Sequence, residues 1–110
     1  MNDLGEVDVK VGCFSKTPYG RYESDGDFSG EKFRDTVLVE YFRDENIKKV
    51  NVYLDTVEDG YEYGSSFLEE AFGGLVRVCG VPKEVVLEKI NIVTEHRDYI
   101  LEIKDYISGV

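Results

Sequence analysis

Histidine, serine and cysteine are the side chains that could make this chain a nucleophilic catalyst. His96 is the only histidine, so a Ser-His or Cys-His pair would have to join it to Ser66, Cys13 or Cys79. His96 falls at an expected strand-to-helix junction, where a histidine is more often a cap or a surface residue. Carboxylates are abundant, but no spacing marks a catalytic pair, and no phosphate-binding glycine loop or dinucleotide fingerprint is present. We therefore expect no enzymatic activity.

Metal binding is also not expected. Cys13 and Cys79 stand apart from each other without a Cys-x-x-Cys spacing, and a single histidine cannot complete a zinc ligand set. The two cysteines are expected to be small core residues in a reducing cytoplasm. We expect no metal and no cofactor.

A capped helix is the strongest local signal, and it follows a strand-like segment. Ser66 followed by Glu69 matches a capping box, and an apolar stripe continues for three turns. The stripe is Leu68, Phe72, Leu75, Val76 and Cys79. At a helix start, Ser65 and Ser66 could hold an anion or a phosphoryl group, and the alternative is that they only cap the helix.

Two adjacent glycines, Gly73 and Gly74, interrupt this expected helix. Each costs roughly 1 kcal/mol relative to alanine, so a compensating contact is expected. Gly74, beside Ala71, could let the sheet approach closely. Alternatively Gly73, between Glu69 and Arg77 on the outer face, could leave a shallow groove for a partner.

The charge balance restricts the class of partner. The 110 residues carry 23 acidic and 13 basic side chains, a net charge of −10. Direct binding to DNA or RNA is disfavoured, because nucleic-acid affinity comes mainly from Lys and Arg on phosphates. A protein with a basic surface is favoured, although acidity can also serve solubility alone. The charges gather in two expected loops: Glu23, Asp25 and Asp27 in one, and Asp55, Glu58, Asp59 and Glu62 in the other.

Strands and helices are expected to alternate along the chain. Strands are predicted from Glu6 to Phe14, from Lys49 to Leu54 near the centre of the sheet, and from Ile90 to Thr94. Helices are predicted from an N-cap at Ser29 to about Asp44, from Ser66 to Cys79, from Pro82 to about Glu88, and from Glu95 to Ile107. Residues 15–29 are predicted to form an ordered loop or a short hairpin.

This alternation predicts an α/β fold, with α+β as the alternative class: a small mixed β-sheet with its helices packed on one face. Residues 1–110 are expected to form a single domain. The first residues lack a signal-peptide pattern and no apolar stretch approaches about 18 residues, so a cytoplasmic protein is expected, in the host cytoplasm if phage-encoded.

Three segments that span most of the chain resemble one known family. Phe28-Ser-Gly-Glu-Lys-Phe-Arg-Asp35 is similar to the start of that family's first helix, Val50 to Asp55 to its central strand, and Gly64 to Arg77 to its most diagnostic block. The family is the STAS-like family, relatives of the bacterial anti-sigma factor antagonists. The resemblance implies a small α/β domain that binds other proteins, commonly in a switch with a kinase-like or ATPase partner, without chemistry of its own.

The same resemblance implies a phosphorylation site. In the better-understood antagonists this loop reads Asp-Ser-Ser-Gly, and the partner phosphorylates the second serine. By that comparison Ser66 is the candidate, with Ser65 beside it. This chain has Gly64 in place of the aspartate and Phe67 in place of the glycine.

The sequence is consistent with two functions. The first is a non-enzymatic regulatory module, a monomer or weak homodimer, that binds a basic protein partner and neither nucleic acid nor membrane. Its contact residues are expected in the 55–64 loop, the following helix and the earlier acidic loop: Asp55, Glu58, Asp59, Glu62, Glu69, Glu70, Gly73, Arg77, Glu23, Asp25 and Asp27. The second is an acidic inhibitor of the phage anti-CRISPR type that mimics nucleic acid and blocks a basic groove.

Overall fold

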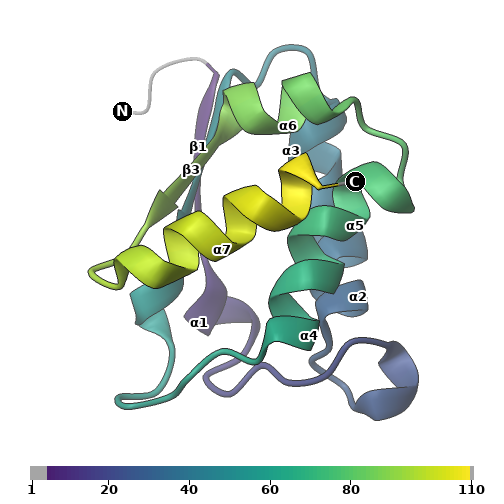
Figure 1. Cartoon of the computed structure of the whole chain (residues 1–110). Coiled ribbons are helices and arrows are strands. Elements are labelled where there is room, and N and C mark those ends of the chain that lie inside the picture. The colour runs from purple at the N-terminus through teal and green to yellow at the C-terminus, as the bar shows by residue number, and fades with distance from the viewer. Residues whose placement is uncertain (1–4, 110) are drawn as a thin grey trace.

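The computed structural model describes residues 5–109, and its centre is a three-stranded parallel sheet (Figure 1). The strands are β1 (Glu6–Lys10), β2 (Lys49–Tyr53) and β3 (Ile90–Val93), in the order β1-β2-β3. Pairing places Val9 opposite Val52, and Val52 opposite Ile92. The expected α/β class and the central position of the second strand are confirmed. Both strand pairs are parallel, so the described sheet is not mixed.

Helices cover one face of this sheet (Figure 1). The first long helix is continuous through α2 (Gly30–Phe33), η2 (Arg34–Leu38) and α3 (Val39–Arg43), and the second through α4 (Ser65–Leu68), η4 (Glu69–Gly73) and α5 (Gly74–Arg77). The middle part of each is a π-helical turn. Two more helices complete the layer: α6 (Lys83–Lys89) and α7 (Arg97–Ser108).

The core lies between this helical layer and the apolar face of the sheet. Val50, Val52 and Leu54 are fully buried there, as their alternation predicts. The two long helices and α7 supply the other side of the core: Phe33, Leu38, Phe42, Leu68, Phe72, Leu75, Ile103 and Ile107. Ser29 caps the first long helix by accepting a hydrogen bond from the Lys32 N–H at 3.2 Å, as expected.

The opposite face of the sheet is polar. Its centre is Asn51, which donates to Asp8 at 3.0 Å and to Glu6 at 3.1 Å and accepts from Asn91 at 2.9 Å. These bonds run across all three strands, so they satisfy a side chain that the sheet itself buries.

The first strand is shorter than expected. It was predicted to reach Phe14, but the chain leaves the sheet at Val11 and forms a helical turn, α1 (Val11–Phe14). Cys13 is consequently exposed and Cys79 half-buried, so Cys13 is not the core residue that was expected. Residues 15–29 form a loop containing one 3₁₀ turn, η1 (Glu23–Asp25), and a second such turn, η3 (Leu54–Thr56), follows β2.

Candidate functional site

Both acidic loops leave the sheet at the same edge. Because the strands are parallel, the carboxyl ends of β1, β2 and β3 lie together, and the loops that follow β1 and β2 begin there. Figure 1 shows the two loops and the start of α4 at one end of the molecule, with α6 at the other. We call residues 15–29 and 55–66 the loop end.

Hydrogen bonds connect the two loops directly. The Glu58 N–H donates to the Lys16 carbonyl at 2.9 Å, and the Tyr61 hydroxyl donates to the Pro18 carbonyl. The Lys16 ammonium donates to the Thr56 carbonyl at 3.0 Å. The sequence gives no sign of these contacts, because they join residues about forty positions apart.

The four predicted acidic residues of the second loop divide into two groups. Asp55 accepts from the Thr94 hydroxyl at 2.6 Å and from the Glu95 N–H at 2.8 Å, so it fastens η3 to the segment before α7. Glu58, Asp59 and Glu62 are exposed to solvent. Asp55 is exposed as well, so a partner can contact all four carboxylates, and Asp55 has a structural role in addition.

The first loop shows the same division and adds exposed aromatic rings. Asp25 accepts from the Arg21 N–H at 3.1 Å and the Tyr22 N–H at 2.9 Å, which holds the loop in its own shape. Glu23, Asp25 and Asp27 are all exposed. Beside them Tyr19, Tyr22 and Phe28 are 71%, 49% and 47% exposed. Exposed aromatic side chains are enriched at protein interfaces, and none of these three is predicted as a contact residue from the sequence.

An ion-pair network occupies the helix face that was expected to contact a partner. Glu70 is only 2% exposed and pairs with Arg34, itself 2% exposed, at 2.5 Å. Arg21 and Arg77 reach the other Glu70 oxygen at 3.1 and 3.2 Å, and both also pair with Glu69. The prediction of Glu70 as a contact residue is wrong, because burial removes it from the surface. Glu69 remains half-buried and Arg77 exposed.

Gly73 is likewise not part of a surface groove. A Cβ there would lie 2.7 Å from the Glu69 carboxylate and 3.3 Å from the Tyr106 carbonyl, so α7 packs directly over it. At Gly74 a Cβ would lie 2.6 Å from the Arg34 guanidinium. The packing explanation for the glycine pair therefore holds, but the neighbours are α7 and a buried arginine of the first long helix, not the sheet.

Ser65 and Ser66 are exposed at the start of α4, but neither caps it. The N-cap is Gly64 and no side chain bonds there, while the Glu69 carboxylate binds arginines. The predicted capping box is therefore wrong. The two serines share a cavity of about 410 Å³ with Tyr19 and Arg21. This arrangement leaves the Ser66 hydroxyl accessible.

Several side chains of the network and of the neighbouring core have pKa values outside their ordinary range. Burial alone would raise the pKa of Glu70, but hydrogen bonds from Arg34, Arg77 and Arg21 outweigh it and lower the pKa. Burial, assisted by the hydrogen bond to Glu102, raises the pKa of Tyr106 to about 12. Burial also raises the pKa of Tyr63, whose hydroxyl donates to the Leu54 carbonyl at 2.7 Å. Glu70 is thus an anion near neutral pH, and both phenols are protonated.

The residues that could have formed a nucleophilic pair are not joined by hydrogen bonds in residues 5–109. His96 precedes α7 as its N-cap and its ring lies against Tyr99, with centroids 5.7 Å apart. Within the described part of the chain, one set of carboxylates has the spacing of a metal site: Glu23, Glu31 and Asp35, with ligand atoms within 4.8 Å. Local contacts account for two of them, since Glu31 accepts from the Glu23 N–H and Asp35 pairs with Arg34.

No helix between residues 5 and 109 is long and apolar enough to cross a membrane.

Comparison with known protein families identifies the family of this chain. Residues 29–98, more than half of the chain, match the model of a family described as a STAS-like domain of unknown function (DUF4325). The matched region runs from the N-cap of the first long helix to the start of α7 and includes β2, β3 and the second loop. No curated protein and no solved structure matches the chain.

Proposed function

This chain belongs to the STAS-like domain family, and we propose that it is a non-enzymatic regulatory module that binds a basic protein partner through its loop end. The role resembles that of an anti-sigma factor antagonist. No bound group and no catalytic step is required for such a role, because the partner performs any chemistry.

One observation carries this proposal: the two acidic loops lie at one end of the molecule together with exposed aromatic rings. Glu58, Asp59 and Glu62 of the second loop supply negative charge, and Tyr19 and Tyr22 of the first loop supply apolar contact area. The hydrogen bonds between the loops fix this surface before a partner arrives. Pre-organisation reduces the entropy lost on association.

The helix that follows the second loop contributes less than expected. Glu69 and Arg77 pair with each other at 2.7 Å and can form the rim of the contact surface, while Glu70 and Gly73 lie beneath it. Rim charges mainly affect the association rate. The proposed interface is therefore centred on the loops.

We expect neutralisation of the loop charges to weaken partner binding without unfolding the protein. The variant Glu58→Gln/Asp59→Asn/Glu62→Gln should reduce affinity by about tenfold at low salt and flatten its salt dependence, since exposed charge pairs are each worth up to about 1 kcal/mol. Asp55 is left unchanged because it fastens the loop. The measurement is affinity capture from a host lysate with mass spectrometry, followed by binding kinetics at low and high salt.

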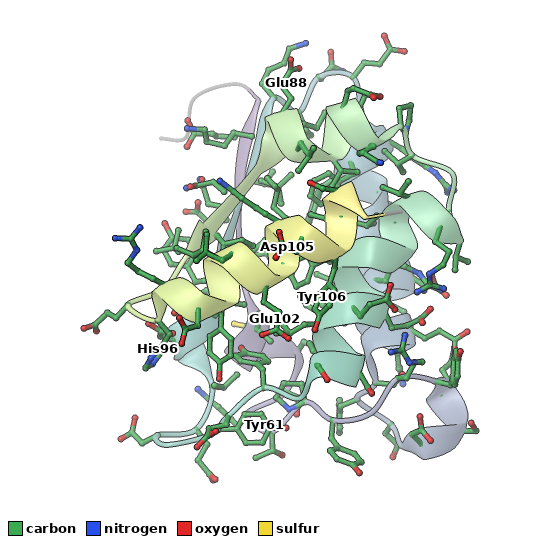
Figure 2. The ribbon with its side chains drawn as sticks, viewed as in Figure 1. Tyr61, Glu88, His96, Glu102, Asp105 and Tyr106 are labelled. Carbon is green, nitrogen blue, oxygen red and sulfur yellow. The ribbon has the colours of Figure 1, made fainter. Side chains whose placement is uncertain are left out.

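The matched control is Glu45→Gln/Glu84→Gln/Glu88→Gln, which removes three exposed carboxylates from the other end of the molecule (Figures 1 and 2). The control should retain the partner at wild-type affinity. Equal binding by both variants would contradict a docking role for the loop end.

Ser66 is the proposed regulatory position. Because its hydroxyl neither caps the helix nor is buried, Ser66→Ala should change the free energy of unfolding by less than about 0.5 kcal/mol and leave binding intact. Ser66→Asp should raise the affinity at low salt, because it adds a negative charge beside Glu69 within a surface that is proposed to bind a basic partner. Denaturant unfolding and binding titration measure the two effects. Wild-type affinity in both variants would exclude a charge switch at Ser66.

The competing proposal is an acidic inhibitor that mimics nucleic acid. The net charge of −10 supports it. In that case the binding energy should be distributed over several acidic clusters, including Glu23 and Asp27, and both triple variants should weaken capture. Excess DNA or RNA should then displace the protein from its partner.

A further inference from the structure

A cavity of about 620 Å³ lies between residues 60–62 of the second loop and the first turns of α7. Tyr61, His96 and Tyr99 supply its aromatic walls, and Glu62, Asp98 and Glu102 supply its charges. Figure 2 shows Tyr61 below α7, with His96 at the start of that helix and Glu102 on its middle part. The volume is within the range of sites that hold small ligands or side chains.

The two tyrosine rings are fixed at their hydroxyl ends. The Tyr61 hydroxyl donates to the Pro18 carbonyl, and the Tyr99 hydroxyl accepts from the Tyr63 N–H at 3.0 Å. Edge-to-face contacts support both rings, since the Tyr63 ring lies 5.9 Å from Tyr61 and 5.3 Å from Tyr99 between centroids. The aromatic walls therefore exist without a ligand, and binding does not have to order them.

The charges of the cavity are not neutralised by the protein. Neither lysine nor arginine lines it, and all ion pairs within 4 Å among residues 5–109 involve Arg21, Arg34 or Arg77. Glu102 accepts a hydrogen bond from the Tyr106 hydroxyl at 2.5 Å. This hydroxyl is a neutral donor, so it does not compensate the carboxylate charge. The cavity thus combines aromatic walls with an excess of negative charge.

We propose that this cavity binds the guanidinium group of an arginine side chain of the partner protein. The inference rests on the proposed protein-binding function and assigns the part of the partner that the second loop recognises. A cation over a tyrosine face is attracted by the ring quadrupole, and the attraction is stronger where water is displaced.

Arginine fits this cavity better than lysine for two reasons. A planar guanidinium stacks on aromatic rings, and its fork of N–H groups can donate to two carboxylates at once. Glu62 of the loop and Asp98 of α7 both line the cavity, so one bound guanidinium could donate hydrogen bonds to both carboxylates. A lysine ammonium is a compact, strongly hydrated charge that gains less from ring stacking.

The experiment is an NMR titration of the ¹⁵N-labelled full chain with N-acetyl-arginine N-methylamide. We expect saturable shifts of the Tyr61, Asp98 and Tyr99 amides, with a dissociation constant on the order of millimolar for a ligand of this size. The corresponding citrulline derivative has nearly the same shape without the charge, and it should bind at least about tenfold more weakly. The lysine derivative should bind more weakly than arginine.

Asp98→Asn and Asp105→Asn form a matched pair of variants, because both aspartates are exposed on α7 but only Asp98 lines the cavity. Figure 2 shows Asp105 on α7, beyond Glu102. Asp98→Asn should weaken the arginine derivative about three- to tenfold, and Asp105→Asn should leave it within about twofold. The proposal would be overturned by equal losses in the two variants or by the absence of a saturable shift. It would also be overturned if the citrulline or the lysine derivative bound as tightly as the arginine derivative. If the arginine derivative fails while the loop variant still loses the partner, only this assignment fails. A partner retained by the loop variant would refute the proposed function itself.

Discussion

Replacing Glu70 by glutamine should lower the free energy of unfolding by about 3 kcal/mol, measured by urea denaturation at neutral pH. Glu70 and Arg34 are each 2% exposed and pair at 2.5 Å. The substitution keeps the size of the side chain but removes the charge that compensates a buried guanidinium. Arg34 would keep Asp35 as its ion-pair partner, and that carboxylate is 45% exposed and screened by water. A loss below about 1 kcal/mol would contradict this account of the network.

A double variant separates the energetic contribution of the Arg34–Glu70 ion pair from that of side-chain packing. In Arg34→Met/Glu70→Leu both charges are removed together, and the apolar replacements have similar volumes. Replacing a buried ion pair in this way is often close to neutral, whereas removing one partner is costly. The double variant should therefore be more stable than either single variant. If the two single losses added instead, the two charges would not be coupled.

Acid should weaken the same network. The folded-state pKa of Glu70 lies below its ordinary value of 4.5, so on acidification the unfolded chain takes up the proton first. The stabilisation is complete above the ordinary pKa and is lost as the pH falls through the lower folded-state value. The difference in stability between the wild type and Glu70→Gln should therefore shrink as the pH falls below the ordinary pKa of 4.5. A difference that stays constant as the pH falls would contradict the assignment.

The periodic parts of the fold could be predicted because each signal lies within a few residues. The alternation of Val50, Val52 and Leu54 gave a buried strand, and Phe33, Leu38 and Phe42 gave one face of a helix. The N-cap at Ser29 was found for the same reason, since the cap and its donor, Lys32, are three residues apart. Such features are decided by local periodicity and capping chemistry.

The candidate site could be predicted only in its charges. Glu58, Asp59 and Glu62 are exposed as expected, because clustered charge in a loop requires water. The capping box failed because Glu69 binds Arg21, 48 positions away, and no local pattern reports such a partner. The prediction that Glu70 contacts a partner was wrong for the same reason, since Glu70 is buried in an ion pair with Arg34 of another helix. Ion pairs between distant parts of the chain therefore determine the positions of these two carboxylates, and local sequence preferences do not.

The end of the first strand illustrates the same limit. The alternation of Val7, Val9 and Val11 indicated a strand to Phe14, but the chain turns into α1. At this turn the Gly12 N–H donates to the Thr56 hydroxyl at 2.8 Å, and that hydroxyl donates to the Tyr53 carbonyl at 2.9 Å. These bonds join the carboxyl ends of β1 and β2, where both loops begin.

Gly12→Ala should therefore lower the free energy of unfolding by about 2 to 3 kcal/mol, measured by urea denaturation. A Cβ at Gly12 would lie 1.9 Å from the Thr56 carbonyl oxygen, which is backbone and cannot rotate away. Helix propensity alone predicts the opposite sign, a gain of up to about 1 kcal/mol for alanine within α1. The control is Gly64→Ala, where a Cβ would meet nothing within 4 Å, and its cost should stay below about 1 kcal/mol. Because η3 would have to shift to admit the methyl group, Gly12→Ala should also weaken partner binding. A Gly12→Ala variant that is more stable than the wild type would instead show that the turn between β1 and α1 has room for the methyl group.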